Sequence, residues 1–220
     1  MTDERYHQHQ FSLPPGATEL VLVRHGASGP AVAGEPFPLR DGHSDPSLAP
    51  EGAAQARALA ERLAGEPLAG VFVSPLRRTA QTAAPLAART GAEPVVIGDL
   101  REVHLGEMEG VFRIRVANGD PLIARVWAQE RWDVIPGAEP MDAFARRVRA
   151  AADAVVAAAG PDCAVAVVTH GGVIAELCHQ ATGSRAFAFI NVDNASISRL
   201  VVLADGTWLL RGYNDTAHLA

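Results

Sequence analysis

Apolar and polar positions alternate along the chain in a way that predicts strands and helices in turn. Four short apolar runs are typical of buried strands, at 19–23, 71–73, 94–97 and 164–168. Longer segments with helical spacing lie between and after them, at 51–63, from Ser74-Pro75 to about 89 and at 141–159. A last helix is expected to follow Gly171-Gly172 and to end at about 182. Two further strands, at 196–203 and 207–211, flank Asp205-Gly206, a dipeptide typical of hairpin turns. This order predicts a three-layer α/β fold, a mostly parallel central sheet with helices on both faces.

The remaining segments define the domain organisation. Residues 1–18 are polar at first, end in Pro14-Pro15-Gly16, and are predicted to be a flexible tail. Loops rich in Gly, Pro, Ser or acidic residues are expected at 27–50 and 99–110. We interpret about 111–136 as a helical excursion beside the sheet. The sequence therefore predicts a single domain over 19–220.

Composition and charge restrict the function. The 220 residues are 48% hydrophobic and 20% charged, as in soluble globular proteins, and the net charge is −6. The negative charge argues against nucleic acid or an anionic membrane as a partner. The chain has no apolar run of 18 residues and no signal-peptide pattern at its start, and its two cysteines make no disulfide framework. We expect a cytoplasmic protein. Formation of a homodimer is left as an open alternative.

Two of the predicted strands end in a histidine that is followed by glycine. His25 lies in Val23-Arg24-His25-Gly26, and His170 precedes Gly171-Gly172. Ligands of open α/β sheets bind at the carboxyl ends of the strands, where the N-termini of the following helices favour anions. One such histidine would more often be structural. Two in the same setting favour an anion-binding site.

Two more segments carry charged residues that could act at such a site. Arg77 and Arg78 lie in the first turn of a predicted helix, where the helix dipole disfavours a cation unless an anion binds there. The loop at 99–110 carries Glu102, Glu107 and Glu109, and the default interpretation is a solvated acidic loop.

Together these segments resemble the histidine phosphatase superfamily, in its phosphoglycerate-mutase-like branch. The most specific element is Leu22-Val23-Arg24-His25-Gly26. The segment 74–82 is similar to the family's S-P-L-x-R-x-x-Q-T stretch and selects Arg78 over Arg77. Glu102 stands at the family's E-x-x-x-G position, and His170 at its second histidine. The run from Asp45 to Ala56 fits D-x-x-L-x-x-x-G-x-x-Q-A.

The resemblance implies a reaction and a role for each of these residues. His25 would be the nucleophile that forms a phosphohistidine, with its other ring nitrogen donating to a backbone carbonyl. Glu102 would protonate the leaving oxygen and then activate water. The phosphoryl oxygens would be held by Arg24, Arg78 and His170, with Gly171 and Ser28 as further contacts. No metal or other cofactor is expected, because cationic side chains supply the charge.

The sequence departs from the family pattern just after its first histidine. Ala27-Ser28 stands where the family commonly has Glu or Gln and then Thr. The asparagine that often follows and contacts phosphate has no counterpart in 29–34. Ser28 or a backbone amide could take over that contact.

Substrate recognition is expected from the excursion. Arg113 could contact a second anionic group, and Trp127 and Trp132 could flank a sugar or base; alternatively both tryptophans pack the excursion against the sheet. His43 could line the entrance, although a histidine in a loop is more often solvated.

The long segments of the glycolytic mutases are absent from this chain. We therefore expect a phosphomonoester hydrolase that acts on a small phosphorylated metabolite. A phosphoglycerate-type mutase is the alternative within the family. A weakly active phospholigand-binding protein is a further alternative, supported only by Ala27 and the missing asparagine.

Overall fold

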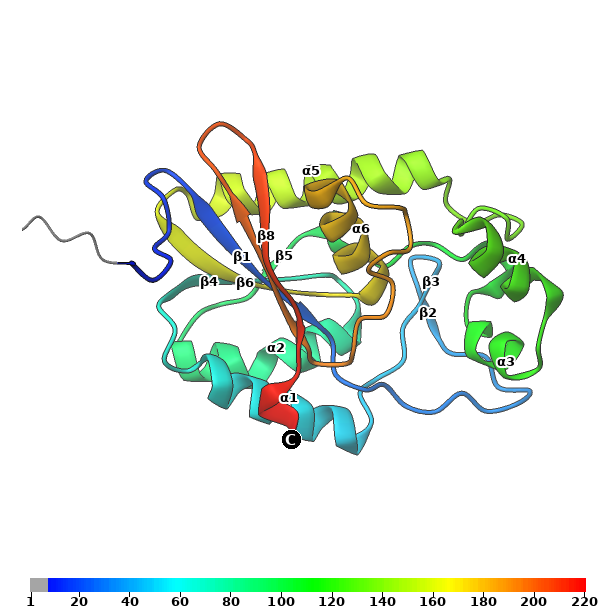
Figure 1. Cartoon of the computed structure of the whole chain (residues 1–220). Coiled ribbons are helices and arrows are strands. Elements are labelled where there is room, and N and C mark those ends of the chain that lie inside the picture. Colours follow the sequence, from blue (N-terminus) through cyan, green and yellow to red (C-terminus); the bar gives the residue numbers. More distant parts are fainter. Residues whose placement is uncertain (1–7) are drawn as a thin grey trace, which may run out of the picture.

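A six-stranded sheet runs through the middle of the molecule (Figure 1). The computed structural model describes residues 8–220; the part of the predicted tail at 1–7 lies outside the described residues. In spatial order the strands are β5 (Val95–Val96), β4 (Leu68–Val73), β6 (Cys163–Thr169), β1 (Thr18–Arg24), β7 (Ile197–Val202) and β8 (Trp208–Asp215). The pairs from β5 to β1 are parallel, and β7 runs antiparallel to both β1 and β8. The predicted mostly parallel sheet is confirmed.

Two helices cover each face of the sheet (Figure 1). The helices are α1 (Pro50–Leu63) and α2 (Arg77–Thr90) on one face, and α5 (Met141–Ala159) and α6 (Gly171–Thr182) on the other. The alternation of side chains along β1 builds both cores. Val21 and Val23 pack with residues of α1 and α2, whereas Leu20 and Leu22 pack with residues of α5 and α6.

The smaller elements lie beyond the end of the sheet at which β1 stops (Figure 1). The predicted excursion forms α3 (Phe112–Ala117) and α4 (Pro121–Gln129), so its helical character is confirmed. The long loop before α1 contains a small hairpin of β2 (Leu39–Arg40) and β3 (His43–Ser44). Three short 3₁₀ turns complete the chain, at Gly98–Leu100, Gly106–Met108 and Ala217–Leu219.

The predicted tail is too long at its carboxyl end. Ala17 is fully buried, and β1 already begins at Thr18. Gly16 N donates to Asp162 Oδ1 at 2.6 Å, and Asp162 N donates to Ala17 O at 2.8 Å. These contacts with the start of β6 make residues 16–18 part of the domain.

Three predicted element boundaries are also wrong. The helix expected from Ser74 begins at Arg77, because the backbone of Leu76 is extended (φ −76°, ψ 140°). The strand expected at 94–97 is reduced to two exposed residues at the sheet edge. Strand β8 continues four residues past 211, through Gly212, a residue that usually weakens strands.

Backbone segments meet closely where β1 leads into the site. A Cβ added to Gly52, near the start of α1, would lie 2.0 Å from Ala27 O. A Cβ on Gly26 would lie 2.5 Å from Gly52 O. Both glycines therefore permit an approach between α1 and the residues after His25 that no other residue type allows.

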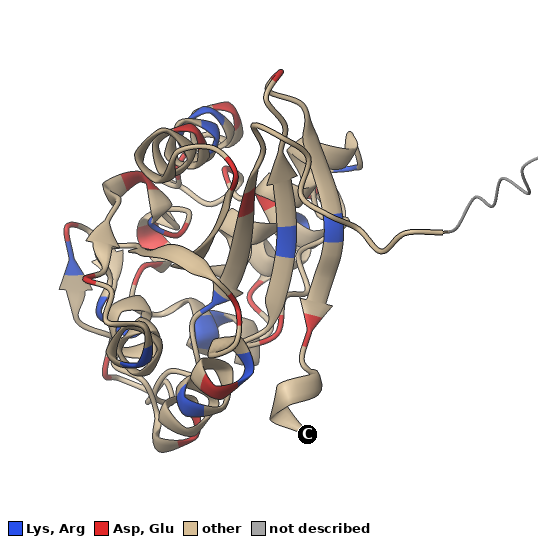
Figure 2. Cartoon of the chain, turned by 90° about the vertical axis from the view of Figure 1, so that its left-hand side faces the viewer, with Lys and Arg blue, Asp and Glu red and all other residues tan. Residues whose placement is uncertain are grey.

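Acidic and basic residues are interspersed over the elements seen in Figure 2. Several arginines are neutralised by carboxylates, such as Arg199 with Glu66 at 2.5 Å and Arg211 with Glu19 at 2.7 Å. Within residues 8–220, no helix combines the length and apolar character that a membrane crossing requires.

Candidate active site

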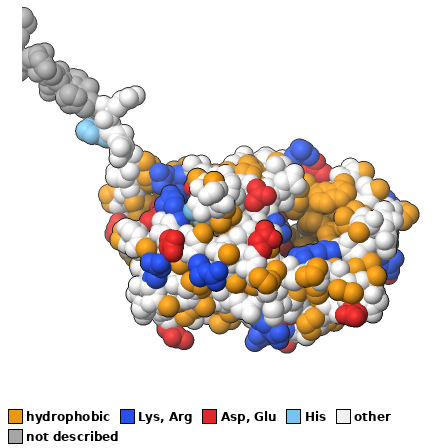
Figure 3. All heavy atoms as spheres, turned by 90° about the horizontal axis from the view of Figure 1, so that it is seen from below, with side chains coloured by type: hydrophobic (Ala, Val, Ile, Leu, Met, Phe, Trp, Pro, Cys, Tyr) orange, Lys and Arg blue, Asp and Glu red, His pale blue; other side chains and the backbone are white. Residues whose placement is uncertain are grey.

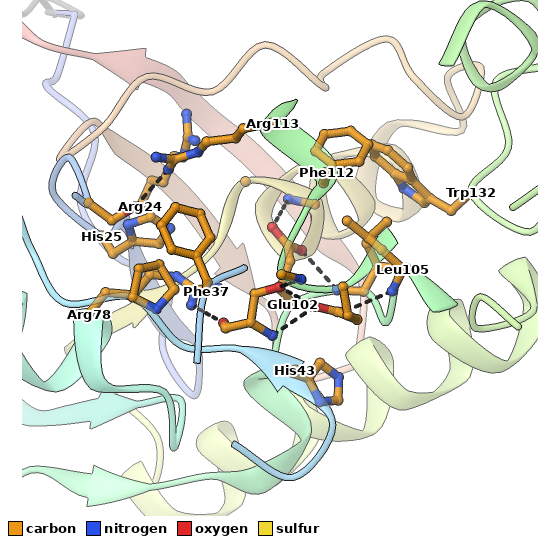
Figure 4. A pocket seen from close by; sticks show the side chains of 18 of the residues that line it. Arg24, His25, Phe37, His43, Arg78, Glu102, Leu105, Phe112, Arg113 and Trp132 are labelled. Atoms are coloured by element: carbon orange, nitrogen blue, oxygen red, sulfur yellow. Dashed lines mark hydrogen bonds between the residues drawn. The ribbon is translucent and has the colours of Figure 1, made fainter. Parts of the chain in front are cut away.

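A pocket of about 300 Å³ lies between the end of β1 and the excursion (Figure 4). Nearly all of the residues predicted for the site line it, namely Arg24, His25, Ser28, His43, Arg78, Glu102, Arg113, Trp127 and Gly171. His170 is fully buried behind this surface, and its ring centroid lies 5.2 Å from that of His25. The fold thus brings together residues that are up to 147 positions apart in the sequence, from Arg24 to Gly171.

His25 follows the last residue of β1 and is held by backbone groups. Its Nδ1 lies 2.8 Å from Gly26 O, and because a carbonyl only accepts, Nδ1 carries the proton and Nε2 keeps its lone pair. Asn194 donates through Nδ2 to His25 O at 2.9 Å. Burial lowers the pKa of His25 well below its usual value, and the nearby Arg78 and Arg24 cations add to this effect. The imidazole is therefore neutral at pH 7.

His170 sits between β6 and α6. Its Nε2 lies 2.8 Å from Ser74 Oγ, which in turn contacts Thr79 Oγ1 at 3.0 Å. Burial and then Arg78 lower the pKa of His170 well below its usual value. Its Nδ1 has no hydrogen-bond partner within residues 8–220.

Three arginines from separate elements reach the pocket. Arg24 donates through Nη1 to Val192 O, and Arg78 donates through Nη1 to Ser44 O at 2.6 Å. Arg113, on α3, donates to Ser28 Oγ at 2.7 Å and to Gly29 O at 3.0 Å. All of these acceptors are uncharged.

Glu102 lies near enough to Arg24 and Arg78 to favour their charged forms, but Arg24, Arg78 and Arg113 form no direct ion pair within residues 8–220. Within the described part of the chain, none of them has a carboxylate oxygen within 4.0 Å. Burial lowers the pKa of Arg78 to about 10 and also lowers the pKa of Arg24 and Arg113. Partly desolvated guanidinium groups without a direct ion pair are suited to bind an anion such as a phosphoryl group.

The three glutamates of the acidic loop have different surroundings. Glu109 accepts from Leu105 N at 2.9 Å, from Ser44 N at 2.7 Å and from the Ser44 hydroxyl, and Glu107 is exposed. Glu102 lines the pocket and accepts from Val103 N at 3.0 Å and Gly172 N at 3.1 Å. Glu102 and Glu109 thus both line the pocket, and Glu109 accepts one more hydrogen bond than Glu102.

Gly172 makes room for the Glu102 carboxylate. A Cβ at that position would lie 2.4 Å from Glu102 Oε1. The second glycine of Gly171-Gly172 therefore lets Glu102 and the N-terminus of α6 meet, which the sequence pattern alone did not predict.

Ala27 and Ser28, which depart from the family pattern, both make hydrogen bonds in the structure. Ala27 N donates to Gln55 Oε1 at 2.8 Å, so its backbone makes a contact to α1. Ser28 is joined to Arg113 instead of remaining free. Sequence reasoning missed Ser44, Val192 and Asn194, which hold the site from behind, because nothing in their local sequence marks them. It marked Ser74 as part of a motif but did not predict its contact with His170.

The two tryptophans differ in burial. Trp132 is buried, with its ring centroid 4.9 Å from that of Phe187, so it packs the excursion. Trp127 is 45% exposed, stacks edge to face on Trp132 at 6.1 Å, and lines the pocket with it. His43 is buried rather than solvated, since its ring lies against that of His104 at 5.0 Å.

Within residues 8–220, His, Cys, Asp and Glu side chains form no group of three that could hold a metal ion.

Comparisons with known proteins show which family the chain resembles. Residues 20–216 match the model of the histidine phosphatase superfamily, branch 1. The chain is 33% identical over 208 residues to a protein named metal-independent phosphoserine phosphatase from Arabidopsis thaliana, covering 92% of this chain and 84% of that protein. It is 32% identical over 205 residues to phosphoglycerate mutase-like protein 4 from the same plant, covering 91% of this chain and 86% of that protein.

Two mycobacterial proteins extend the comparison. A bifunctional protein of Mycobacterium tuberculosis is 33% identical over 205 residues, and the chain spans 55% of its length. The solved structure of mycobacterial glucosyl-3-phosphoglycerate phosphatase is similar with a TM-score of 0.74 and 29% identity, covering 91% of this chain and all of that one. From the family match over nearly its whole length, the chain belongs to the histidine phosphatase superfamily, branch 1.

Proposed function

We propose that this chain hydrolyses phosphomonoesters of small metabolites through a phosphohistidine formed on His25. The observation that carries the proposal is the state of His25, which is neutral, with Nδ1 held by Gly26 O and Nε2 left unprotonated. The arginines around it have no carboxylate oxygen within 4.0 Å in residues 8–220. A neutral imidazole beside unpaired cations is suited to attack a phosphate dianion.

The first half of the reaction transfers the phosphoryl group to the enzyme. His25 Nε2 forms a bond to phosphorus while the bond from phosphorus to the alcohol oxygen breaks. Glu102, in its protonated form, gives its proton to that leaving oxygen. Arg24 and Arg78 hold the oxygens that carry charge in the transition state, and donors fixed in this way lower the barrier.

The second half releases phosphate. Glu102, now a carboxylate, takes a proton from water as the water oxygen bonds to phosphorus. The bond from phosphorus to Nε2 breaks, and its electron pair returns to His25. The sum is ester and water to alcohol and phosphate, with Glu102 protonated again.

We place His170, Ser28 and Gly171 among the phosphate contacts. The Nδ1 of His170 lacks a partner within residues 8–220, and a phosphoryl oxygen would supply one. Ser28 and Gly171 border the pocket beside His25. Two relatives bear the names of phosphatases of phosphoserine and glucosyl-3-phosphoglycerate, which supports a small phosphorylated metabolite as substrate.

Phosphate release tests the proposal. The purified chain is assayed on sugar phosphates, phosphoserine, phosphoglycerates and p-nitrophenyl phosphate, beside His25→Ala and the control His179→Ala, a histidine of α6 outside the pocket. We expect release by the wild type and the control and a loss of at least about 10³-fold in His25→Ala. Unchanged turnover in His25→Ala would contradict the proposal. Conversion of 3-phosphoglycerate to its 2-phospho isomer faster than phosphate release would instead indicate a mutase.

A further inference from the structure

A turn over residues 193–196, just before β7, holds the end of β1 from behind. The backbone N–H of its last residue donates to the carbonyl of its first at 3.2 Å. Asn194 Nδ2 donates to His25 O at 2.9 Å. Ala195 N donates to Arg24 O at 3.0 Å and also lies 3.3 Å from His25 O. The turn therefore fixes the backbone of both residues with which the proposed site begins.

Ala195 has a backbone conformation that needs support from outside the turn. Its φ is 56°, in the left-handed region, where a residue with a Cβ is disfavoured. Turns that place a left-handed residue third usually have glycine or asparagine there. An alanine persists in this conformation only where surrounding contacts hold it. The contacts made by Ala195 therefore decide how firmly the turn keeps its form.

One such contact comes from the 3₁₀ turn at Ala217–Leu219. His218 Nε2 lies 3.0 Å from Ala195 O, and because a carbonyl only accepts, Nε2 carries the proton. The 3₁₀ turn itself lies against α1 (Figure 1). Hydrogen bonds thus run from His218 through Ala195 to the end of β1.

The residues just before the turn are fastened separately, by β8. The Tyr213 hydroxyl lies 2.8 Å from Asn191 O, next to Val192. The side chain of Arg24 donates to Val192 O. That side chain therefore has a support in which His218 takes no part.

His218 does not reach the pocket. It is not among the residues that line the pocket, and the hollow visible in Figure 3 lies in the half of the molecule that contains the excursion. Any effect of His218 on a reaction in the pocket therefore passes through the backbone of the turn.

We infer that His218 is a positioning residue for the phosphoryl transfer proposed above, on which this inference rests. Through Ala195 it fixes the backbone of His25, and with it the direction in which Nε2 points at phosphorus. In-line displacement tolerates little misplacement, since a shift of about 1 Å can cost on the order of 10²-fold in rate. The bond to Nε2 forms in one half of the reaction and breaks in the other. The value of kcat therefore reports the position of the ring whichever half is slower.

Two substitutions separate the hydrogen bond of His218 from its bulk. His218→Phe keeps a ring but cannot donate, whereas His218→Gln keeps an N–H₂ donor near the place of Nε2. On p-nitrophenyl phosphate we expect kcat to fall about tenfold or more in His218→Phe, and His218→Gln to recover most of that loss. The Ki of inorganic phosphate should stay within about threefold in both variants, because the side chains of Arg24, Arg78 and His170 keep their supports.

Val155→Ala controls for a loss of stability alone. Val155 is a buried residue of α5 that does not line the pocket, and its truncation lowers the free energy of unfolding, which urea denaturation measures. At a temperature at which all variants are folded, its kcat should stay within about twofold of wild type. Unchanged kcat in His218→Phe, an equal fall of kcat in Val155→Ala, or a loss that lies in the Ki of phosphate alone would overturn the inference.

NMR of His25 separates this inference from the proposed reaction. We expect the backbone and imidazole ¹⁵N shifts of His25 to change in His218→Phe and to remain at their wild-type values in His218→Gln and Val155→Ala. A wild type that releases no phosphate contradicts the proposed function, and the shifts then decide the inference alone. Changed shifts that His218→Gln restores support the positioning role, and unchanged shifts in His218→Phe overturn it.

Discussion

The state of individual side chains at the site is set by backbone groups as much as by other side chains. Gly26 O fixes the tautomer of His25, and backbone N–H groups of Val103 and Gly172 hold the two oxygens of Glu102. Backbone groups of this kind vary little in position, because strands and helix termini fix them. The two groups proposed to break and form bonds are therefore preorganised before a substrate binds.

Glu102→Gln tests the proposed acid and base role. The amide cannot donate a proton to an alkoxide, so we expect the loss of kcat/KM to be greatest for poor leaving groups. We expect about 10²–10⁴-fold for an alkyl phosphate such as glycerol 1-phosphate, and a much smaller loss for p-nitrophenyl phosphate, whose phenolate needs no proton to depart.

The measurement is kcat/KM on both substrates, with Glu107→Gln, the exposed glutamate of the same loop, as the control. Equal losses on the two substrates in Glu102→Gln would show that the residue does not protonate the leaving group.

At the scale of elements, Ser44 joins the β2–β3 hairpin both to the acidic loop and to α2. Ser44 donates its N–H and its hydroxyl to the carboxylate of Glu109, accepts from Gly110 N at 2.6 Å, and through its carbonyl accepts from Arg78 Nη1 at 2.6 Å. Glu109 thus positions Arg78 through Ser44.

Glu109→Gln should loosen this connection. The carboxylate accepts with both oxygens, one for Leu105 N and one for Ser44, and an amide would turn an N–H₂ donor toward one of these N–H groups. We expect kcat/KM to fall about tenfold or more on every phosphomonoester, because Arg78 is displaced. Glu107→Gln in the same assay should stay within about twofold of wild type. A Glu109→Gln enzyme with unchanged kcat/KM would contradict the positioning role.

Elements with a strong hydrophobic pattern were predictable from the sequence. Their first and last residues were predicted less well. The hydrophobic periodicity of α5 and the apolar run of β6 gave both elements nearly in full. The start of α2 was wrong because Leu76 has an extended backbone, although the Ser74 hydroxyl accepts from Leu76 N at 3.3 Å as well as contacting His170. The hairpin at Leu39–Ser44 is too short to leave a periodicity, and its position depends on contacts with a loop 66 residues away.

At the scale of the whole molecule, the sheet topology explains why sequence motifs could identify the site. It also explains why the residues that hold the site from behind could not be predicted. His25 and His170 follow neighbouring parallel strands, β1 and β6, so their convergence follows from the fold that the sequence predicts. Val192 and Asn194 reach the same place through an irregular segment before β7, and no period or motif predicts that path.

Two buried neutral histidines also make the stability of the whole fold depend on pH. The unfolded chain binds protons on His25 and His170 below about pH 6.5, whereas burial lowers both pKa values in the folded state. The unfolded state then binds more protons, so the free energy of unfolding falls as the pH drops from about 6.5 toward the folded pKa values. The slope approaches about 1.4 kcal/mol per pH unit for each histidine.

Urea denaturation in phosphate-free buffer at pH 7.5 and 5.5 measures this dependence. We expect lower stability at pH 5.5, and a smaller difference between the two pH values in His25→Asn, which removes one of the two groups. Equal stability at both pH values would contradict the neutral, buried state of these histidines.

The central claim is that His25 carries the phosphoryl group during turnover. The most direct measurement mixes the enzyme with p-nitrophenyl [³²P]phosphate, quenches within milliseconds under alkaline denaturing conditions, and maps the label by peptide analysis. The account predicts label on the peptide that contains His25, stable in base, lost in acid and absent from His25→Ala. Label on another residue, label that survives acid, or turnover with no trapped label under conditions that slow dephosphorylation would contradict it.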